Sequence, residues 1–415
     1  MTEPAQQPLQ APRGRSLGPG LLLAASGIGA GDVVVASVTG MRFGLTLLWA
    51  VVLTVVLKYV VTEALARWQL ATGETIARAW VTRLPRWAGA GFGLYLVFWT
   101  FMVGASLSSA CGIAGASLAG FGATAQWGAA HALVAAALVA GNRYTRFQKV
   151  MKALVAVMAV CVLGCAVLAA PSLGELLGGL AVPMIPPGGA AQVLALLGGI
   201  GGSLTVICYG YWMRGEGWRG VERLGAVRSD VRLAYVFTGL FGVALVVIAA
   251  GVEARGGGAR LALDVADRLG AVAGPWARVV FLLGFWCTVF TAMLGVWQGV
   301  PQIYTDIVDA WRGASGGKVG VNHGRERAVR LGALGFLAGP PLLLLWHKEP
   351  VAVVVAFSIT GAFVMPFLAA TLLYLNNCRE WMGTLANGRA GNAALVLSLL
   401  AFGAVCVAEI LKAAR

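Results

Sequence analysis

Eleven stretches of mostly apolar residues, each about as long as a membrane-spanning helix, dominate this sequence of 415 residues. A helix needs about 20 apolar residues to cross the hydrocarbon core of a bilayer. Only 12% of the residues are charged, against roughly 25% in soluble domains. The sequence therefore predicts an all-α, multi-pass integral membrane protein. The expected spans lie near residues 17–38, 44–66, 90–112, 126–141, 147–170, 190–223, 230–252, 275–303, 328–346, 350–376 and 391–411.

The positive charges predict the orientation of these spans. If the N-terminus is cytoplasmic, that side holds 22 of the 31 lysines and arginines, and eight lie on the opposite side. Basic residues concentrate in cytoplasmic loops, so we expect a cytoplasmic N-terminus and an outside C-terminus, in a plasma (inner) membrane of the bacterial type. We expect residues 1–16 to form a disordered cytoplasmic tail. Because the basic loops face anionic lipid, the net charge of +14 indicates no nucleic-acid partner.

The sequence carries few residues suited to catalysis. Its three histidines are scattered, and its seven cysteines form no CxxC pair, which makes zinc and disulfide sites unexpected. The segment "GASGGK" at 313–318 lacks the spacing of an ATP-binding loop. We expect neither an enzyme nor a bound cofactor, and no use of ATP.

Two of the expected spans are interrupted, and they lie five spans apart. In the first span Gly27, Gly29 and Gly31 are followed directly by Asp32, although a charge at mid-membrane costs on the order of 3 kcal/mol or more. The sixth span reads "GGIGGSLTVICYGYW" and is also rich in glycine. Glycines also serve close helix packing, but three within five residues before an acid indicate a functional break. Paired interruptions of this kind predict a secondary transporter with inverted repeats and a site between the broken helices.

Several motifs resemble those of the Nramp family of proton-coupled divalent metal transporters, within the APC superfamily. The similar segments include "GPGLLLAASGIGAGD", "TGETIARAW", "RYTRFQKVMKALV" and "FSITGAFVMPF". The resemblance implies the LeuT fold, with two inverted five-helix repeats (spans 1–5 and 6–10), broken spans 1 and 6, and an eleventh helix. It places the transporter core at 17–376, and a cytoplasmic loop with the extra C-terminal transmembrane helix at 377–415.

The positions that bind metal in the family differ here. The Asp-Pro-Gly-Asn of the first break reads Gly29 to Asp32, and the Ala-Thr-Val-Met-Pro-His of the second reads Leu204 to Tyr209. The glutamine of the tenth span is Thr360. Asp32 is the expected metal ligand. The substrate-binding residues implied by the resemblance are Gly29, Ala30, Gly31, Asp32, Leu204, Thr205, Ile207, Cys208, Tyr209 and Thr360.

The altered site leaves three interpretations open. Oxygen ligands without a thioether favour a hard cation such as Mg²⁺ or Mn²⁺, with proton coupling implied by the family. A glycine-rich break also resembles that of amino-acid transporters, whose exposed backbone N–H groups hold a substrate carboxylate, so a small solute with a carboxylate or amine is the alternative. The third interpretation is a relative that has lost transport.

Charged residues elsewhere in the spans predict a proton or gating network. Glu63 and Arg67 are spaced to pair on one helix, whereas Lys58 is interpreted first as extending toward water at the cytoplasmic end and alternatively as part of the network. Arg214 and Glu216 follow the second break, where ion pairs are expected to close an inner gate.

Overall fold

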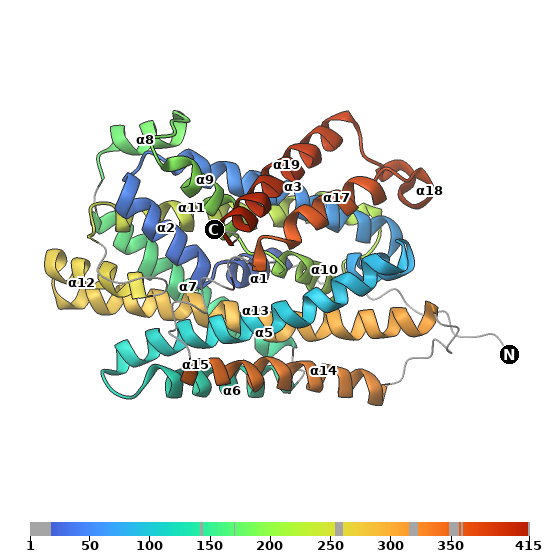
Figure 1. Ribbon diagram of the computed structural model, residues 1–415, viewed down its shortest axis with the longest axis horizontal. Helices are drawn as coiled ribbons and strands as arrows, with labels where there is room; N and C mark the ends of the chain where they lie inside the picture. Colours follow the sequence, from blue (N-terminus) through green and yellow to red (C-terminus); the bar gives the residue numbers. More distant parts are fainter. Residues whose placement is uncertain are drawn as a thin grey trace.

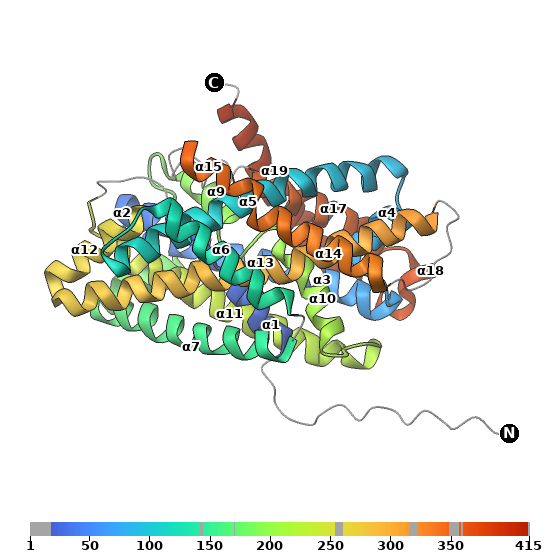
Figure 2. The same ribbon diagram turned by 90° about the horizontal axis from the view of Figure 1, so that it is seen from below.

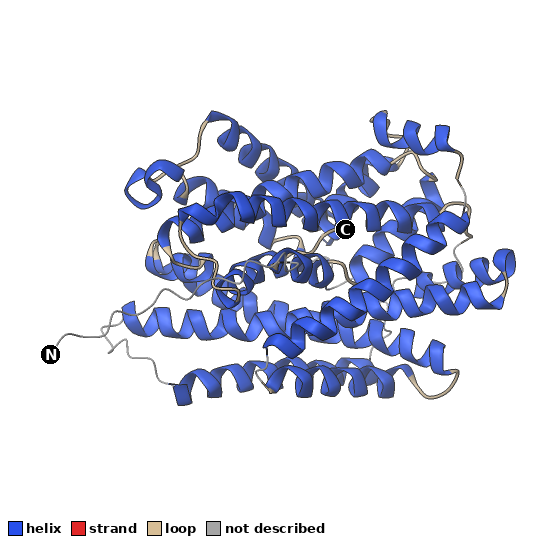
Figure 3. Cartoon of the chain, turned by 180° about the vertical axis from the view of Figure 1, so that it is seen from behind, coloured by secondary structure: helices blue, strands red, loops and turns tan. Residues whose placement is uncertain are grey.

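The computed structural model describes residues 18–141, 144–169, 171–253, 260–314, 323–347, 357 and 360–413, and no strand occurs among them (Figure 3). The cytoplasmic tail expected at 1–16 lies outside the described residues. The α-helices are α1 (Pro19–Gly27), α2 (Ala30–Phe43), α3 (Leu48–Thr72), α4 (Ile76–Thr82), α5 (Arg86–Ala119), α6 (Thr124–Ala140), α7 (Tyr144–Ala169), α8 (Leu173–Ala181), α9 (Gly189–Gly199), α10 (Thr205–Gly215), α11 (Leu224–Ala249), α12 (Leu261–Ala273), α13 (Pro275–Ala314), α14 (His323–Ala338), α15 (Leu343–His347), α17 (Val364–Leu375), α18 (Arg379–Met382) and α19 (Arg389–Ala413).

The helices match the expected membrane spans. By length and composition, α3, α5, α7, α11, α13, α19 and the segment from α14 through α15 are each able to cross a bilayer. The pair α1 and α2, bent by 60° at its break, is long and apolar enough to form one further span when the two helices are taken together. The shorter apolar helices α6, α9 and α17 lie at the remaining expected spans, 126–141, 190–223 and 350–376. The predicted all-α, multi-span architecture is therefore confirmed.

Helix α13, 40 residues long, is the central element of the packing. In Figure 1 it runs across most of the width of the molecule, with α6 and α14 along one side, both in contact with it. The view turned by 90° shows α7 beside α13 on another side (Figure 2), where the two helices pack together. The short helix α1 contacts α10, α11 and α13, so the first broken helix lies inside the bundle.

Several polar residues are buried inside the bundle. Asp32 and Lys58 are 5% and 0% exposed, and the hydroxyl residues Ser26, Thr205 and Thr238 are buried with them. Burying a charge away from water costs several kcal/mol unless it is paired and hydrogen-bonded. Polar groups inside a membrane protein therefore mark a functional region, and here they gather around the breaks in both interrupted helices.

Candidate functional site

The first interruption separates α1 from α2 by two residues in extended conformation. Ile28 and Gly29 leave the helical conformation, and α2 restarts at Ala30. The carboxylate of Asp32, in the first turn of α2, accepts a hydrogen bond from the Gly29 backbone N–H at 2.8 Å. An acid in this position satisfies an N–H group that the helix start leaves without a partner, and it also interacts favourably with the helix dipole. Local chemistry therefore stabilises the break.

The second interruption, between α9 and α10, depends on two consecutive glycines. Gly201 and Gly202 have φ angles of +81° and +73°, a left-handed conformation that costs other residues roughly 1–2 kcal/mol. The turn directs the Gly201 N–H to Asp32, whose Oδ1 accepts it at 2.6 Å. A Cβ on Gly202 would lie 2.9 Å from the Cα of Gly27, so the two breaks touch through glycine.

One carboxylate thus links both interrupted helices. Asp32 accepts one backbone hydrogen bond from each break, through different oxygens. Such charge-assisted bonds are shorter and about twice as strong as neutral ones. Each carboxylate oxygen can accept two hydrogen bonds, so Asp32 still has capacity to bind a cation or a donor group from the cavity that it lines.

Lys58 of α3 also contacts the second break. Its ammonium donates a hydrogen bond to the Gly202 carbonyl oxygen, with an Nζ–O distance of 2.5 Å. Its side chain is 0% exposed, and its charge interacts with that of Asp32. The interpretation of Lys58 as extending toward water at the membrane surface is therefore wrong, because the side chain points into the bundle toward the break.

A cavity of about 260 Å³ adjoins both breaks. Its polar lining comes from Asp32, the breaks themselves, the hydroxyls of Ser26, Ser203 and Thr205, and Glu409 of α19. The Ser26 and Thr205 hydroxyl oxygens are buried without a hydrogen-bond partner in the described part of the chain. The larger apolar residues of the lining are Val34, Val35, Trp99, Val103, Leu107, Leu194, Val296, Phe357 and Val405.

The structure places half of the sequence-predicted binding residues in this cavity and half outside its lining. Those that line it are Gly29, Ala30, Gly31, Asp32 and Thr205. Those outside its lining are Leu204, Ile207, Cys208, Tyr209 and Thr360, all of them buried.

Two residues outside the lining have contacts elsewhere. The Cys208 side chain faces Gly299 of α13, where an added Cβ would overlap it. Thr360 accepts a hydrogen bond from the Tyr95 hydroxyl through its backbone oxygen at 3.0 Å. Within the described residues, no group of three His, Cys, Asp or Glu side chains could hold a metal ion. A metal in this cavity would thus meet the carboxylate of Asp32 at the breaks, that of Glu409 elsewhere on the wall, hydroxyls and backbone.

Asp230 of α11 forms a second link between the interrupted helices, on the side of α1 and α10. It accepts hydrogen bonds from the Gly20 backbone N–H at 2.6 Å and from the Tyr209 hydroxyl at 2.9 Å. Sequence reasoning did not identify Asp230, because an acid near the start of a long span is typical of a membrane–water interface. Tyr209, predicted to bind substrate, contacts this second carboxylate.

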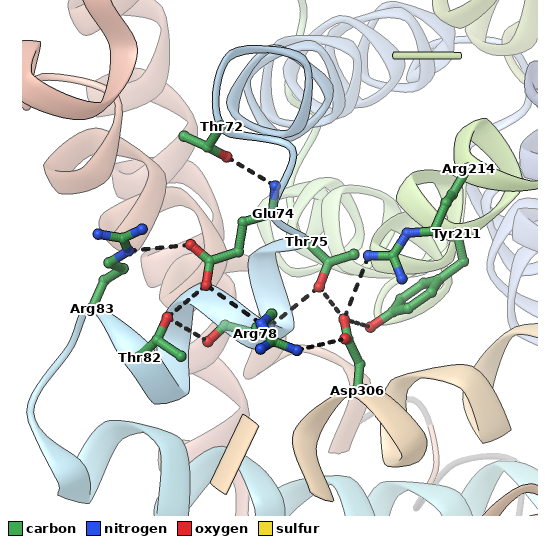
Figure 4. Close-up of polar contacts among 9 residues, drawn as sticks. All are labelled: Thr72, Glu74, Thr75, Arg78, Thr82, Arg83, Tyr211, Arg214 and Asp306. Carbon is green, nitrogen blue, oxygen red and sulfur yellow. Dashed lines mark hydrogen bonds and ion pairs between the residues drawn. The ribbon is translucent and has the colours of Figure 1, made fainter. Parts of the chain in front are cut away.

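A third acid, Asp306 near the end of α13, organises a larger polar cluster (Figure 4). It accepts hydrogen bonds from the Thr75 hydroxyl and, at 3.0 Å, from the Tyr211 hydroxyl. The guanidinium groups of Arg78 and Arg214 each lie 3.9 Å from it. The cluster lines a cavity of about 610 Å³ and joins α4, α10 and α13.

The predicted gating residues pair only in part as expected. Glu63 and Arg67 form the expected ion pair at 3.2 Å, and Arg228 joins them at 2.9 Å from Glu63. Arg214 approaches Asp306, whereas Glu216 accepts a hydrogen bond from Gln148. Asp306 lies beyond residue 303, where the sequence placed the end of that span, so it was not considered as a partner.

Comparison with known proteins identifies the family and the fold. The model of the family described as natural resistance-associated macrophage protein-like (Nramp) matches residues 20–412. The chain is similar to the Eremococcus coleocola manganese transporter, in a crystal structure with an aromatic bis-isothiourea substituted compound, at 16% identity over 96% of this chain and 88% of that chain, with a TM-score of 0.72. No curated protein sequence matches the chain.

Two further solved structures are similar over nearly their whole length. Mhp1, a nucleobase-cation-symport-1 family transporter, is 14% identical over 96% of this chain and 93% of that chain, with a TM-score of 0.55. MhsT in complex with L-phenylalanine is 17% identical over 94% of this chain and 99% of that chain, with a TM-score of 0.52. These likenesses assign the LeuT fold to the helices described above.

Proposed function

We propose that the chain, which belongs to the Nramp family, is a secondary transporter that moves a hard divalent cation such as Mg²⁺ or Mn²⁺ past Asp32. The observation that carries this proposal is the position of the Asp32 carboxylate, which holds both broken helices and lines the cavity between them. A cation that binds one carboxylate shared by two half-helices is able to couple its own binding to a rearrangement of these helices. The solved structure of a manganese transporter with this fold also supports a divalent cation.

The donor atoms favour a hard cation that keeps most of its water. Ser26, Ser203 and Thr205 supply hydroxyl oxygens, Asp32 supplies a carboxylate at the breaks, and Glu409 of α19 supplies a second carboxylate to the cavity lining. Mg²⁺ retains several waters when it binds to proteins, commonly through one or two carboxylates. A water occupies about 30 Å³ of liquid, so a cavity of about 260 Å³ accommodates an ion with much of its hydration shell.

We also propose that transport is coupled to protons and that the chain has a defined orientation in the membrane. The family resemblance implies that protons accompany the metal ion, and the distribution of basic residues places the N-terminus in the cytoplasm and the C-terminus outside. The plasma membrane of a bacterial type is the proposed location.

A second candidate function is the transport of a small organic solute that carries a carboxylate or an amine. The apolar side chains of Trp99, Leu107 and Phe357 on the cavity wall favour it, since ligand pockets for organic molecules are mostly apolar with a few placed polar groups. The charge of Lys58 next to Asp32 also offsets the attraction that the carboxylate exerts on a dication.

Uptake into proteoliposomes separates the two candidates. Purified protein would be reconstituted, and Mn²⁺, Mg²⁺ and Cd²⁺ entry would be followed with an enclosed metal-sensitive dye, in parallel with uptake of a panel of labelled amino acids. The proposal expects saturable Mn²⁺ entry that excess Mg²⁺ inhibits, stimulated by an inward proton gradient. Saturable amino-acid uptake without metal entry would instead establish the second candidate.

A further inference from the structure

Lys58 has an environment that the transport of a divalent cation does not by itself explain. The residue lies inside α3, is 0% exposed, and directs its ammonium to the Gly202 carbonyl oxygen of the second break. An unpaired ammonium at this depth would cost several kcal/mol, and the protein offsets this cost with one carbonyl and the nearby charge of Asp32.

The groups around Lys58 resemble the ligands of a small monovalent cation. Gly201 and Gly202, with φ angles of +81° and +73°, turn the chain so that the Gly202 carbonyl meets the ammonium. Backbone carbonyls freed at a helix interruption, together with a carboxylate, are the groups with which broken-helix transporters coordinate monovalent cations.

The remaining neighbours do not supply a competing charge. On α11, the Tyr235 hydroxyl is hydrogen-bonded to Thr62 of α3 at 2.7 Å, and the Thr238 hydroxyl donates to the Ala234 backbone oxygen at 2.9 Å. Among the described groups, the Gly202 carbonyl is therefore the one in direct contact with the ammonium, and the Asp32 carboxylate acts on it through its charge without a direct ion pair.

We infer that the Lys58 ammonium occupies a monovalent-cation site at the second break and acts there as a cation tethered to the protein. The tethered charge stabilises the contact between the two breaks without a dissociable ion. This inference goes beyond the proposed function, and it holds whether the transported species is a metal ion or a small solute.

Shortening the side chain should expose the site to small cations. In Lys58→Ala the carbonyl and the carboxylate lose their cation and leave a space, which Na⁺, K⁺, ammonium or methylammonium is expected to fill. Lys58→Met is the matched control, because it removes the charge but keeps most of the volume. A ligand that binds only the folded state raises the midpoint of thermal unfolding in a saturable manner.

The experiment compares melting temperatures of purified protein in detergent, at constant ionic strength, with choline chloride replaced stepwise by the chloride of each cation. We expect a saturable rise of several degrees with at least one cation for Lys58→Ala, and none for Lys58→Met. A folded Lys58→Ala protein that responds to no cation overturns the inference.

The wild type provides a test that does not depend on how the variants fold. With its ammonium in place, the wild type should melt at the same temperature in Na⁺, K⁺ and choline at matched ionic strength. Saturable stabilisation of the wild type by Na⁺ or K⁺, retained in Lys58→Met, would place the monovalent site elsewhere and overturn the inference. Because this readout uses no transport, its failure is separable from failure of the proposed divalent-cation function.

Discussion

Tyr209 on α10 donates its hydroxyl hydrogen to the Asp230 carboxylate on α11, with an oxygen–oxygen distance of 2.9 Å. The same carboxylate accepts the backbone N–H of Gly20 at the start of α1. Asp230 therefore connects one half of each interrupted helix to α11, while Asp32 connects the two breaks to each other. Two carboxylates therefore connect the interrupted helices: Asp230 through Gly20 and Tyr209, and Asp32 through the breaks. A transport cycle that separates α1 from α10 has to break the Asp230 contacts.

Removing the tyrosine hydroxyl tests this connection. We expect Tyr209→Phe to lower the free energy of unfolding by on the order of 1–3 kcal/mol, because a hydrogen bond to a charged group is lost. It should also increase the labelling of a cysteine introduced in α1. The label is a membrane-impermeant reagent, added on the side of the membrane where α1 begins. Tyr374→Phe, at an exposed tyrosine of α17, is the control. Unchanged labelling in Tyr209→Phe would contradict the role assigned to Asp230.

Gly27 and Gly202 lie in contact, so a single methyl group added at Gly202 is expected to affect both stability and transport strongly. Gly202→Ala forces a left-handed alanine, at roughly 1–2 kcal/mol, and places its Cβ 2.9 Å from the Gly27 Cα. We expect a lower melting temperature and loss of transport. Gly91→Ala, in α5 with nothing within 4 Å of the added Cβ, is the control and should be neutral or slightly stabilising. Equal behaviour of the two variants would show that the contact of the breaks is unimportant.

A sulfur ligand placed directly in the cavity should change metal selectivity. The Thr205 hydroxyl is buried without a partner in the described chain and lines the cavity, so Thr205→Cys exchanges an oxygen donor for a thiol that soft metals prefer. We expect Cd²⁺ to inhibit Mn²⁺ uptake at lower concentration in Thr205→Cys than in the wild type. Thr205→Ser should leave the Cd²⁺ response unchanged. Wild-type protein that already prefers Cd²⁺ to Mn²⁺ would contradict the oxygen-site account.

The charge bias of the loops predicts the topology. A tag at the N-terminus should be protected, and a tag at the C-terminus accessible, when intact cells are treated with an impermeant protease. The physical reason is the retention of basic segments on the cytoplasmic side. Both termini on one side would be incompatible with an odd number of spans.

The sequence predicted the fold and the two interrupted helices because glycine patterns and apolar run lengths are local properties. Gly27 to Asp32 identified the first break. The second was expected at Leu204 to Tyr209 but lies just before it, at Gly201 and Gly202, because α10 already begins at Thr205. The partners across the bundle depend on packing that no local pattern encodes. Lys58 was therefore interpreted as a surface residue, although α3 directs it to a carbonyl 144 positions away.

Two acids that accept hydrogen bonds from tyrosines across the bundle were not predicted from the sequence, for a related reason. Asp230 and Asp306 lie near the ends of long helices, where acids usually contact water. The sequence does not indicate that their carboxylates accept hydrogen bonds from the hydroxyls of Tyr209 and Tyr211. Arg214 was expected to form an ion pair after the second break, but its partner Asp306 on α13 could not be named from the sequence.

The central claim is that Asp32 holds and releases the transported cation. Asn has only one acceptor oxygen, so in Asp32→Asn an amide N–H group would face one of the two backbone N–H groups that the carboxylate now satisfies. The variant thus loses the charge that attracts a cation and one bond between the breaks.

Mn²⁺ uptake by Asp32→Asn in proteoliposomes, normalised to the amount of protein that elutes as a folded species, tests this claim most directly. The wild type should show saturable uptake, and the variant should match protein-free liposomes. Uptake by Asp32→Asn equal to that of the wild type would contradict the account.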